Sequence, residues 1–232
     1  MKTKIFSWLG KEFIEVMGEA KAEASPEQAM NEMFQRCDAE LRRHGLSLDE
    51  AVRLRVWGRE KNARTLATAA RSKILTGNRR AASSSFISEE WFDSAGAVGL
   101  ELLAMRPADS SAERYLVDFE PPRNYLCYLD YEGWLFFSGF TSEAATLEKQ
   151  TEEVVATIES ALIRARTDWS KVVKLSALVQ SGHDMETVRR NLAIAGRRNV
   201  PEIEYSFVDG FAGEKYLLEI EATALKNHSD WG

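Results

Sequence analysis

The alternation of hydrophobic and polar positions predicts the same series of elements twice along the chain. In the first half, residues 25–28 read Ser-Pro-Glu-Gln, the pattern of a helix N-cap with a capping box. Apolar residues then recur at helical spacing up to Gly45, which can end the helix. Residues 53–57 alternate polar and apolar side chains, as a strand with one solvated face does. Further on, the pattern predicts a helix over 62–75 and strands over 83–87 and 97–105.

A shift of 121 residues brings the second half of the chain onto the first. It places Gly18 on Gly139, and it places the Val-Arg-Leu phrase at 52–54 on the Val-Lys-Leu phrase at 173–175. A second helix is predicted again over 185–195, and the strand at 216–225 echoes the one near 97–106 at a shift of 120. Element order, capping residue and strand alternation recur together, so the chain is an internal duplication.

Each copy is predicted to fold as an α+β unit in the order strand–strand–helix–strand–helix–strand–strand. Such a unit has a mostly antiparallel sheet with two helices on one face. Proline, serine and charged residues interrupt both periodicities around 106–114, which sets the two units at 1–107 and 108–232. The other face of each sheet needs a cover, and the sheet of another unit is the expected partner.

Composition narrows the classes of partner. The formal charge of −6 argues against nucleic acid as a ligand, because phosphate binding needs a concentrated basic face. No apolar run reaches the roughly 20 residues of a membrane-spanning helix, and no signal-peptide pattern is present. Cys37 and Cys127 lie in unlike contexts, typical of reduced thiols in a cytoplasmic protein. Metal-type spacings and glycine-rich phosphate loops are lacking, so no cofactor is expected.

Two stretches of the second copy carry a family resemblance. Tyr125 stands 13 residues before the pair Ser138–Gly139, and the strand Glu-Ile-Glu-Ala-Thr-Ala covers 219–224. In this order and spacing they resemble the Rid (reactive intermediate deaminase) superfamily. Its members are small chorismate-mutase-like units whose sheets close into trimeric barrels, with small-ligand pockets in the clefts between units. The resemblance extends over both copies and implies a tandem Rid-like protein.

The resemblance also implies a set of site residues. Glu221 takes the place of the ligand-facing glutamate, and we expect it to position or activate a water, with its pKa raised by burial. Ser138 and Tyr125 are the other catalytic candidates, and the backbone N–H of Gly139 is expected to bind ligand. Each has a structural alternative: a solvated strand position for Glu221, a bulge at Gly139, and an ordinary strand aromatic for Tyr125.

The chain departs from the family at the arginine that pairs with a substrate carboxylate. An ungapped count places Glu204 at that position in the second copy and Ser84 in the first, and neither can form the bidentate clamp. Glu204 would suit a cationic or neutral ligand if it enters the pocket, or is a solvated strand residue. Arg79 or Arg80 of the first copy could supply the missing positive charge across the cleft, and Arg80 is the ligand-binding candidate.

In the first copy the hairpin motif is degraded, with Lys4 and Met17 at the positions of the tyrosine and serine. The functional pocket is therefore expected on the second copy. The expected function is hydrolysis or rearrangement of an imine, enamine or related nitrogen-containing metabolite by a homotrimer. The alternatives are a ligand-binding or scaffold protein without catalysis, and a pathway hydrolase or lyase acting on a chorismate-like compound.

Overall fold

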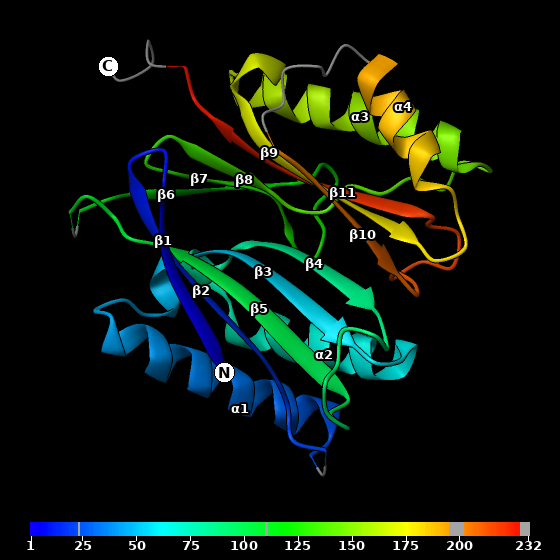
Figure 1. The fold of residues 1–232 in the computed structure, drawn as a ribbon. Coiled ribbons are helices and arrows are strands. Elements are labelled where there is room, and N and C mark those ends of the chain that lie inside the picture. The colour runs from blue at the N-terminus through cyan, green and yellow to red at the C-terminus, as the bar shows by residue number, and fades with distance from the viewer. Residues whose placement is uncertain (23, 110, 195–201, 228–232) are drawn as a thin grey trace.

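The computed structural model describes residues 1–22, 24–109, 111–194 and 202–227. Two β-sheets lie with their inner faces toward each other, and a pair of helices covers the outer face of each sheet (Figure 1). This is the predicted α+β fold of two tandem units. Within the described ranges, no helix is long and apolar enough to cross a membrane.

The first unit forms a five-stranded sheet in the order β1-β2-β5-β3-β4. Only the β3–β4 pair is parallel; the other neighbours are antiparallel. The elements are β1 (Lys2–Trp8), β2 (Lys11–Glu19), α1 (Pro26–Arg43), β3 (Ala51–Gly58), α2 (Lys61–Ile74), β4 (Ala82–Ile87) and β5 (Val98–Met105), with short 3₁₀ turns η1 (Leu48–Glu50) and η2 (Gly77–Arg79).

The second unit repeats this order and adds one strand, so that its sheet runs β10-β9-β11-β8-β7-β6. The added strand, β6 (Arg114–Asp118), begins where the joint was predicted to end. Its other elements are β7 (Leu126–Tyr131), β8 (Trp134–Phe137), α3 (Leu147–Arg164), η3 (Trp169–Lys171), β9 (Val172–Gln180), α4 (Met185–Ile194), β10 (Ile203–Val208) and β11 (Leu218–Leu225). Ala195, the last residue of the helix predicted over 185–195, lies outside the described residues.

Local signals explain where the long helices begin. Ser25 accepts a hydrogen bond from the backbone N–H of Gln28, and the Gln28 side chain accepts one from the backbone of Ser25, which is the predicted capping box. Thr146 is the N-cap of α3, and its side chain accepts a hydrogen bond from the backbone N–H of Lys149. The buried side chains of α1 recur at helical spacing against the first sheet: Met30, Met33, Phe34, Cys37 and Leu41.

An apolar cluster joins the two units. Phe13 of β2 packs against Trp134 and Phe136 of β8, with ring centroids 5.2 Å and 6.4 Å apart. Trp8 of β1 adds a second aromatic contact with Trp134, at 5.0 Å. Because β4 also contacts β7 and β8, the edge of the first sheet lies against the hairpin of the second unit. The inner faces thus meet at one side of the molecule and leave a cavity between them that opens to the surface.

We expect Phe13→Ala to lower the free energy of unfolding by about 3–5 kcal/mol, because it removes a fully buried ring at the junction of the units. Urea denaturation measures the change. Leu9→Ala, at an exposed turn position, is the control and should change stability by less than about 0.5 kcal/mol. Equal effects of the two substitutions would mean that the units do not pack as described.

Candidate functional site

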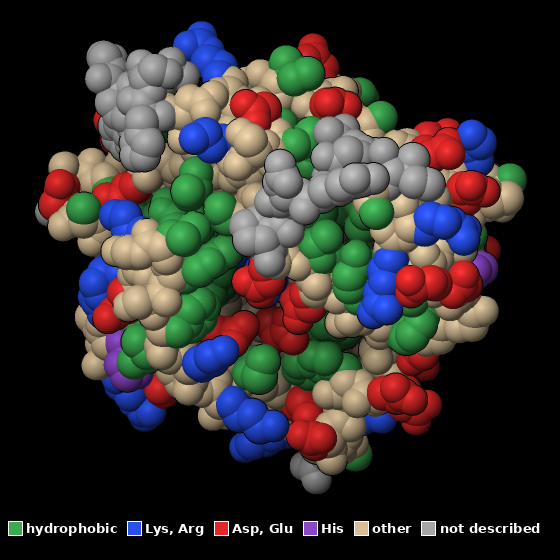
Figure 2. Space-filling view, turned by 45° about the horizontal axis from the view of Figure 1, so that its top comes forward, with side chains coloured by type: hydrophobic (Ala, Val, Ile, Leu, Met, Phe, Trp, Pro, Cys, Tyr) green, Lys and Arg blue, Asp and Glu red, His purple; other side chains and the backbone are tan. Residues whose placement is uncertain are grey.

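The structure distributes the predicted site residues over two hollows. Glu221 and Glu204 line a cavity of about 520 Å³ between the inner faces of the two sheets. Tyr125 and Arg80 line a smaller cleft of about 160 Å³, between the end of α2, the start of β4 and the segment before β7. The face in Figure 2 shows acidic side chains gathered in a central hollow beside apolar ones. The predicted residues therefore do not form one continuous pocket.

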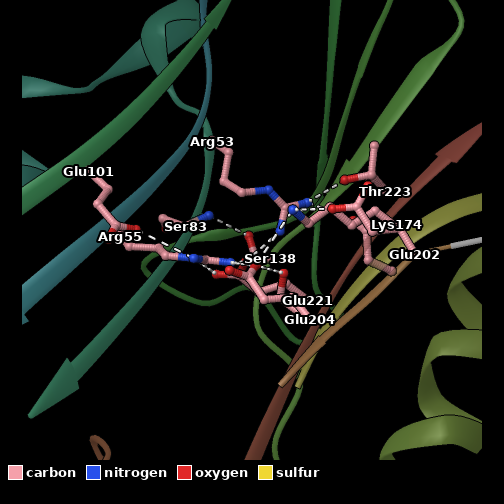
Figure 3. A network of polar contacts seen from close by, with 12 residues as sticks. Arg53, Arg55, Ser83, Glu101, Ser138, Lys174, Glu202, Glu204, Glu221 and Thr223 are labelled. Atoms are coloured by element: carbon pink, nitrogen blue, oxygen red, sulfur yellow. Dashed lines mark hydrogen bonds and ion pairs between the residues drawn. The ribbon is translucent and has the colours of Figure 1, made fainter. Parts of the chain in front are cut away.

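Ser138 lies at the contact between the units. Its Oγ accepts a hydrogen bond of 2.9 Å from the backbone N–H of Ser83 on β4, and the side chain is 1% exposed (Figure 3). The hydroxyl therefore joins the second unit to the edge strand of the first.

The neighbouring Gly139 makes room for a carboxyl group that the sequence interpretation passed over. A Cβ atom built on Gly139 would lie 1.7 Å from Oε1 of Glu219, so the Glu219 side chain rests directly against this backbone. Burial, and then the charge of Glu221, raise the pKa of Glu219 to about 8. Glu219, and not Glu221, is thus the glutamate of this strand that holds a proton near neutral pH.

Glu221 has the opposite electrostatics. Its Oε2 accepts hydrogen bonds from Arg53 Nη1 at 2.7 Å and from Arg55 Nη2 at 2.8 Å (Figure 3). Burial alone would raise the pKa of Glu221, but the charges of Arg55 and Arg53 outweigh it and lower the pKa to about 2. The expectation of a raised pKa is therefore wrong, because the sequence pattern did not reveal these two partners.

Both arginines come from β3, on the strand face that was predicted to be solvated. Their side chains are only 11% and 17% exposed for Arg53 and Arg55, because the polar face of β3 turns toward the second unit. Arg55 also contacts Glu101, with 3.4 Å between Nη1 and Oε2. The signal that could have identified Arg53 was the repeated Val-basic-Leu phrase, because the basic residue of its second copy, Lys174, lines the same cavity.

Glu204, which the sequence resemblance aligns with the arginine of Rid proteins, lines the central cavity and not the cleft. Its Oε2 accepts a hydrogen bond of 3.1 Å from the Ser176 hydroxyl and lies 3.5 Å from Lys174 Nζ. Burial would raise the pKa of Glu204, but Arg55 and Lys174 together lower it. Its counterpart in the first copy, Ser84, is buried on β4 beside Glu219 and Glu221.

The positive charge of the cleft comes mainly from α2. Arg71 is 7% exposed, donates to the Ser83 hydroxyl and, at 3.2 Å, to the carbonyl of Asn124, and its Nε has no hydrogen-bond partner in the described part of the chain. Arg64 lies about two turns before Arg71 on α2 and donates to the Ser85 hydroxyl at 3.0 Å. Among the described residues, no carboxylate lies within ion-pair distance of Arg64 or Arg71.

The two arginines that the sequence proposed as substitutes are already neutralised. Arg80 borders the cleft but forms an ion pair with Asp118. Arg79 is exposed and pairs with Asp49 at 2.5 Å. Of the two arginines that line the cleft, Arg71 is therefore the one without a carboxylate partner among the described residues. Burial lowers its pKa only to about 10, so it stays charged at neutral pH.

A pH dependence of stability follows from Glu219. The unfolded chain releases this proton near pH 4.3 and the folded chain near pH 8, so stability falls as the pH rises between these values. Glu219→Gln should remove this loss, and its stability relative to wild type should increase by on the order of 1 kcal/mol per pH unit. Urea denaturation from pH 5 to pH 8 tests this, with the exposed Glu90→Gln as control. A difference independent of pH would contradict the assignment.

Comparisons with known proteins place this geometry on a known fold. No family model matches the sequence, and no curated protein sequence matches it. The crystal structure of a chorismatase aligns with 92% of this chain and 74% of that chain, with a TM-score of 0.61 and 16% identity.

Single-unit structures match about half of the chain. Rv2704 of Mycobacterium tuberculosis, a member of the YjgF/YER057c/UK114 family, is 24% identical over 49% of this chain and 99% of that chain, with a TM-score of 0.45. NMB1025 of Neisseria meningitidis, a YjgF family member, is 21% identical over 50% and 98%, with a TM-score of 0.41. With its element order written twice and its alignment to chorismatase over both units, the chain has the predicted fold of two tandem Rid-like units.

Proposed function

We propose that the chain is an enzyme that hydrolyses a small carboxylate-bearing imine in the cleft between its two units, with Glu219 as the acid–base group. One arrangement carries this proposal. A buried protonated carboxyl, Glu219, and a buried guanidinium without a carboxylate partner, Arg71, both lie within electrostatic range of the Tyr125 ring hydroxyl. Glu219 belongs to the second unit, and Arg71 belongs to the first unit.

Arg71 supports an anionic substrate. A guanidinium binds a carboxylate in a planar, bidentate geometry, and a buried guanidinium without a counter-ion is costly unless a ligand completes it. This charge is carried by α2 of the first unit. At the position of the arginine in Rid proteins, the sequence has Glu204 in the second copy and Ser84 in the first. The loss of the family's arginine thus does not require a cationic substrate.

Glu219 supports general acid–base catalysis, because a pKa near 8 suits both uptake and release of a proton near neutral pH. Its proton passes to the imine nitrogen as a water oxygen attacks the carbon, and the resulting carboxylate takes a proton from that water. In the carbinolamine so formed, Glu219 protonates the amino group, and the C–N bond breaks. The hydroxyl proton returns to Glu219 as the carbonyl forms, so imine and water give carbonyl and ammonia.

The predicted residues take narrower roles in this scheme. Burial raises the pKa of Tyr125, so its hydroxyl stays neutral and can donate to the ligand, while it accepts from Arg123 Nη1 at 2.9 Å. Gly139 leaves room for the Glu219 carboxyl group, and Ser138 fixes the junction with Ser83.

A second candidate reaction is hydrolysis of a chorismate-type carboxylate. Its support is the alignment of a chorismatase with both units, which concerns the fold, together with the same anionic anchor at Arg71. A third possibility is ligand binding without catalysis, and the cleft volume of about 160 Å³ restricts any of the three roles to a small ligand.

Release of ammonia and carbonyl product from imines generated by amino-acid oxidases tests the proposal. Wild type should accelerate release, and Glu219→Gln should lower kcat by about 10²–10⁴-fold. Arg71→Met should raise KM for carboxylate-bearing imines but leave carboxamide imines unaffected, and Arg79→Met, at the exposed pair with Asp49, should change neither. Lack of acceleration with any imine overturns the proposal. Consumption of chorismate would then favour the second candidate.

We also propose that the chain self-associates, and that the assembly is a homotrimer. Exposed apolar side chains on edge strands of both sheets support self-association: Ile5 on β1 is 49% exposed, and Phe207 on β10 is 52% exposed. Size-exclusion chromatography with light scattering should give the mass of three chains. Ile5→Lys with Phe207→Lys should give the mass of one, and a wild-type monomer would contradict the expectation.

A further inference from the structure

Two glutamates on one strand face lie at the centre of the junction. Glu219 and Glu221 are two residues apart on β11, so their side chains point to the same face, about 7 Å apart along the strand. They are only 7% and 1% exposed, respectively. Two carboxylates this close in a buried setting strongly disfavour simultaneous ionisation.

The contacts of Glu221 make it the ionised member of the pair. Besides the bonds from Arg53 Nη1 and Arg55 Nη2, its two oxygens lie 3.1 Å and 3.3 Å from Arg55 Nε. Arg53 is itself held by the carbonyl of Ala222 at 2.6 Å and by the Thr223 hydroxyl at 3.1 Å. Figure 3 shows both guanidinium groups reaching from the first unit to this carboxylate.

Glu219 has no such partner. Among the described residues, no lysine or arginine nitrogen lies within ion-pair distance of its carboxyl group. The titratable and charged groups that act on it are Glu221 of β11, Arg64 of α2, Arg55 of β3 and Tyr125 before β7, with the Ser84 hydroxyl of β4 beside it. Among these groups, Glu221 is the only carboxylate.

We propose that Glu221 is a positioning residue: fixed as a carboxylate by Arg53 and Arg55 of the first unit, it keeps the neighbouring Glu219 protonated. The first unit thereby sets the protonation state of a group in the second unit. The catalytic consequence rests on the proposed function, in which Glu219 is the acid, whereas the protonation itself is a property of the unliganded chain.

Comparison of the two copies shows that the pair of buried glutamates and the pair of arginines each occur in only one of them. Glu221 has a counterpart in the first unit, Glu101, but Glu219 corresponds to Gly99, and the Trp91 ring occupies the space where a side chain on Gly99 would lie. Conversely, the counterpart of Arg55 in the second unit is Ser176. The carboxyl pair therefore belongs to the second unit alone, and the arginine pair to the first unit alone.

Carbon NMR of protein labelled at the glutamate carboxyls, titrated from pH 4 to pH 9, tests the proposal. In wild type, Glu219 should be protonated and Glu221 ionised at pH 6. Glu221→Gln removes the negative charge and frees two guanidiniums, so both changes should lower the titration midpoint of Glu219. Unit charges about 7 Å apart at an effective dielectric constant of about 20 predict a shift of about 1–2 pH units.

Glu204→Gln is the matched control, because Glu204 also lies near Arg55, at 3.7 Å from Nη2, but on β10. Its effect on the midpoint of Glu219 should be below about half a pH unit. An unshifted midpoint in Glu221→Gln overturns the proposal. If this variant fails to fold, the wild-type titration decides, since Glu219 ionised at pH 6 overturns it as well.

The pH dependence of imine hydrolysis separates the two proposals. If wild type is active, the basic limb of its rate profile should move to lower pH in Glu221→Gln by the same amount as the titration. If wild type is inactive while the NMR midpoints behave as expected, the proposed function fails and the role of Glu221 stands.

Discussion

The carboxylate of Glu221, bound by two arginines of the other unit, is the interaction on which the arrangement of the junction depends. Removing three charged groups from water is costly, and the cost is offset only where geometry and hydrogen bonding are close to complete. Here Arg53 is bonded to the backbone and a hydroxyl of β11 as well as to the carboxylate. The two sheets must therefore keep one fixed orientation relative to each other. The apolar cluster around Phe13 and Trp134 stabilises the same orientation at one side of the junction.

Duplication allows the two sides of this junction to carry different side chains. In an assembly of identical units, each cleft would contain the same residues from both neighbours. In this chain the first unit has Lys4 and Met17 at the positions of Tyr125 and Ser138, and it carries guanidinium groups on β3 and α2. The second unit carries Tyr125, Ser138 and the carboxyl pair. One unit thus supplies positive charge, and the other supplies the groups that can exchange a proton.

Much of the fold could be predicted because its signals are local. The capping box at Ser25 and the alternation of residues 53–57 depend on neighbours along the chain, and the structure confirms both elements. The site was predicted less well. The motif pointed to Glu221, whereas the glutamate of β11 with a raised pKa is Glu219. The burial of Arg71 could not be predicted, because nothing in α2 distinguishes it from a solvated arginine.

The sequence by itself determined the duplication, the order of elements, the type of fold and the strand that carries the carboxyl groups, because each of these follows from periodicity, capping and short motifs. Only the tertiary structure decided which charges meet. The Arg53 and Arg55 side chains reach Glu221 across more than 160 positions of chain, and the pKa of a buried carboxyl depends on such neighbours and on desolvation. Neither quantity is encoded in local sequence, so the protonation states of Glu219 and Glu221 appear only when the two sheets face each other.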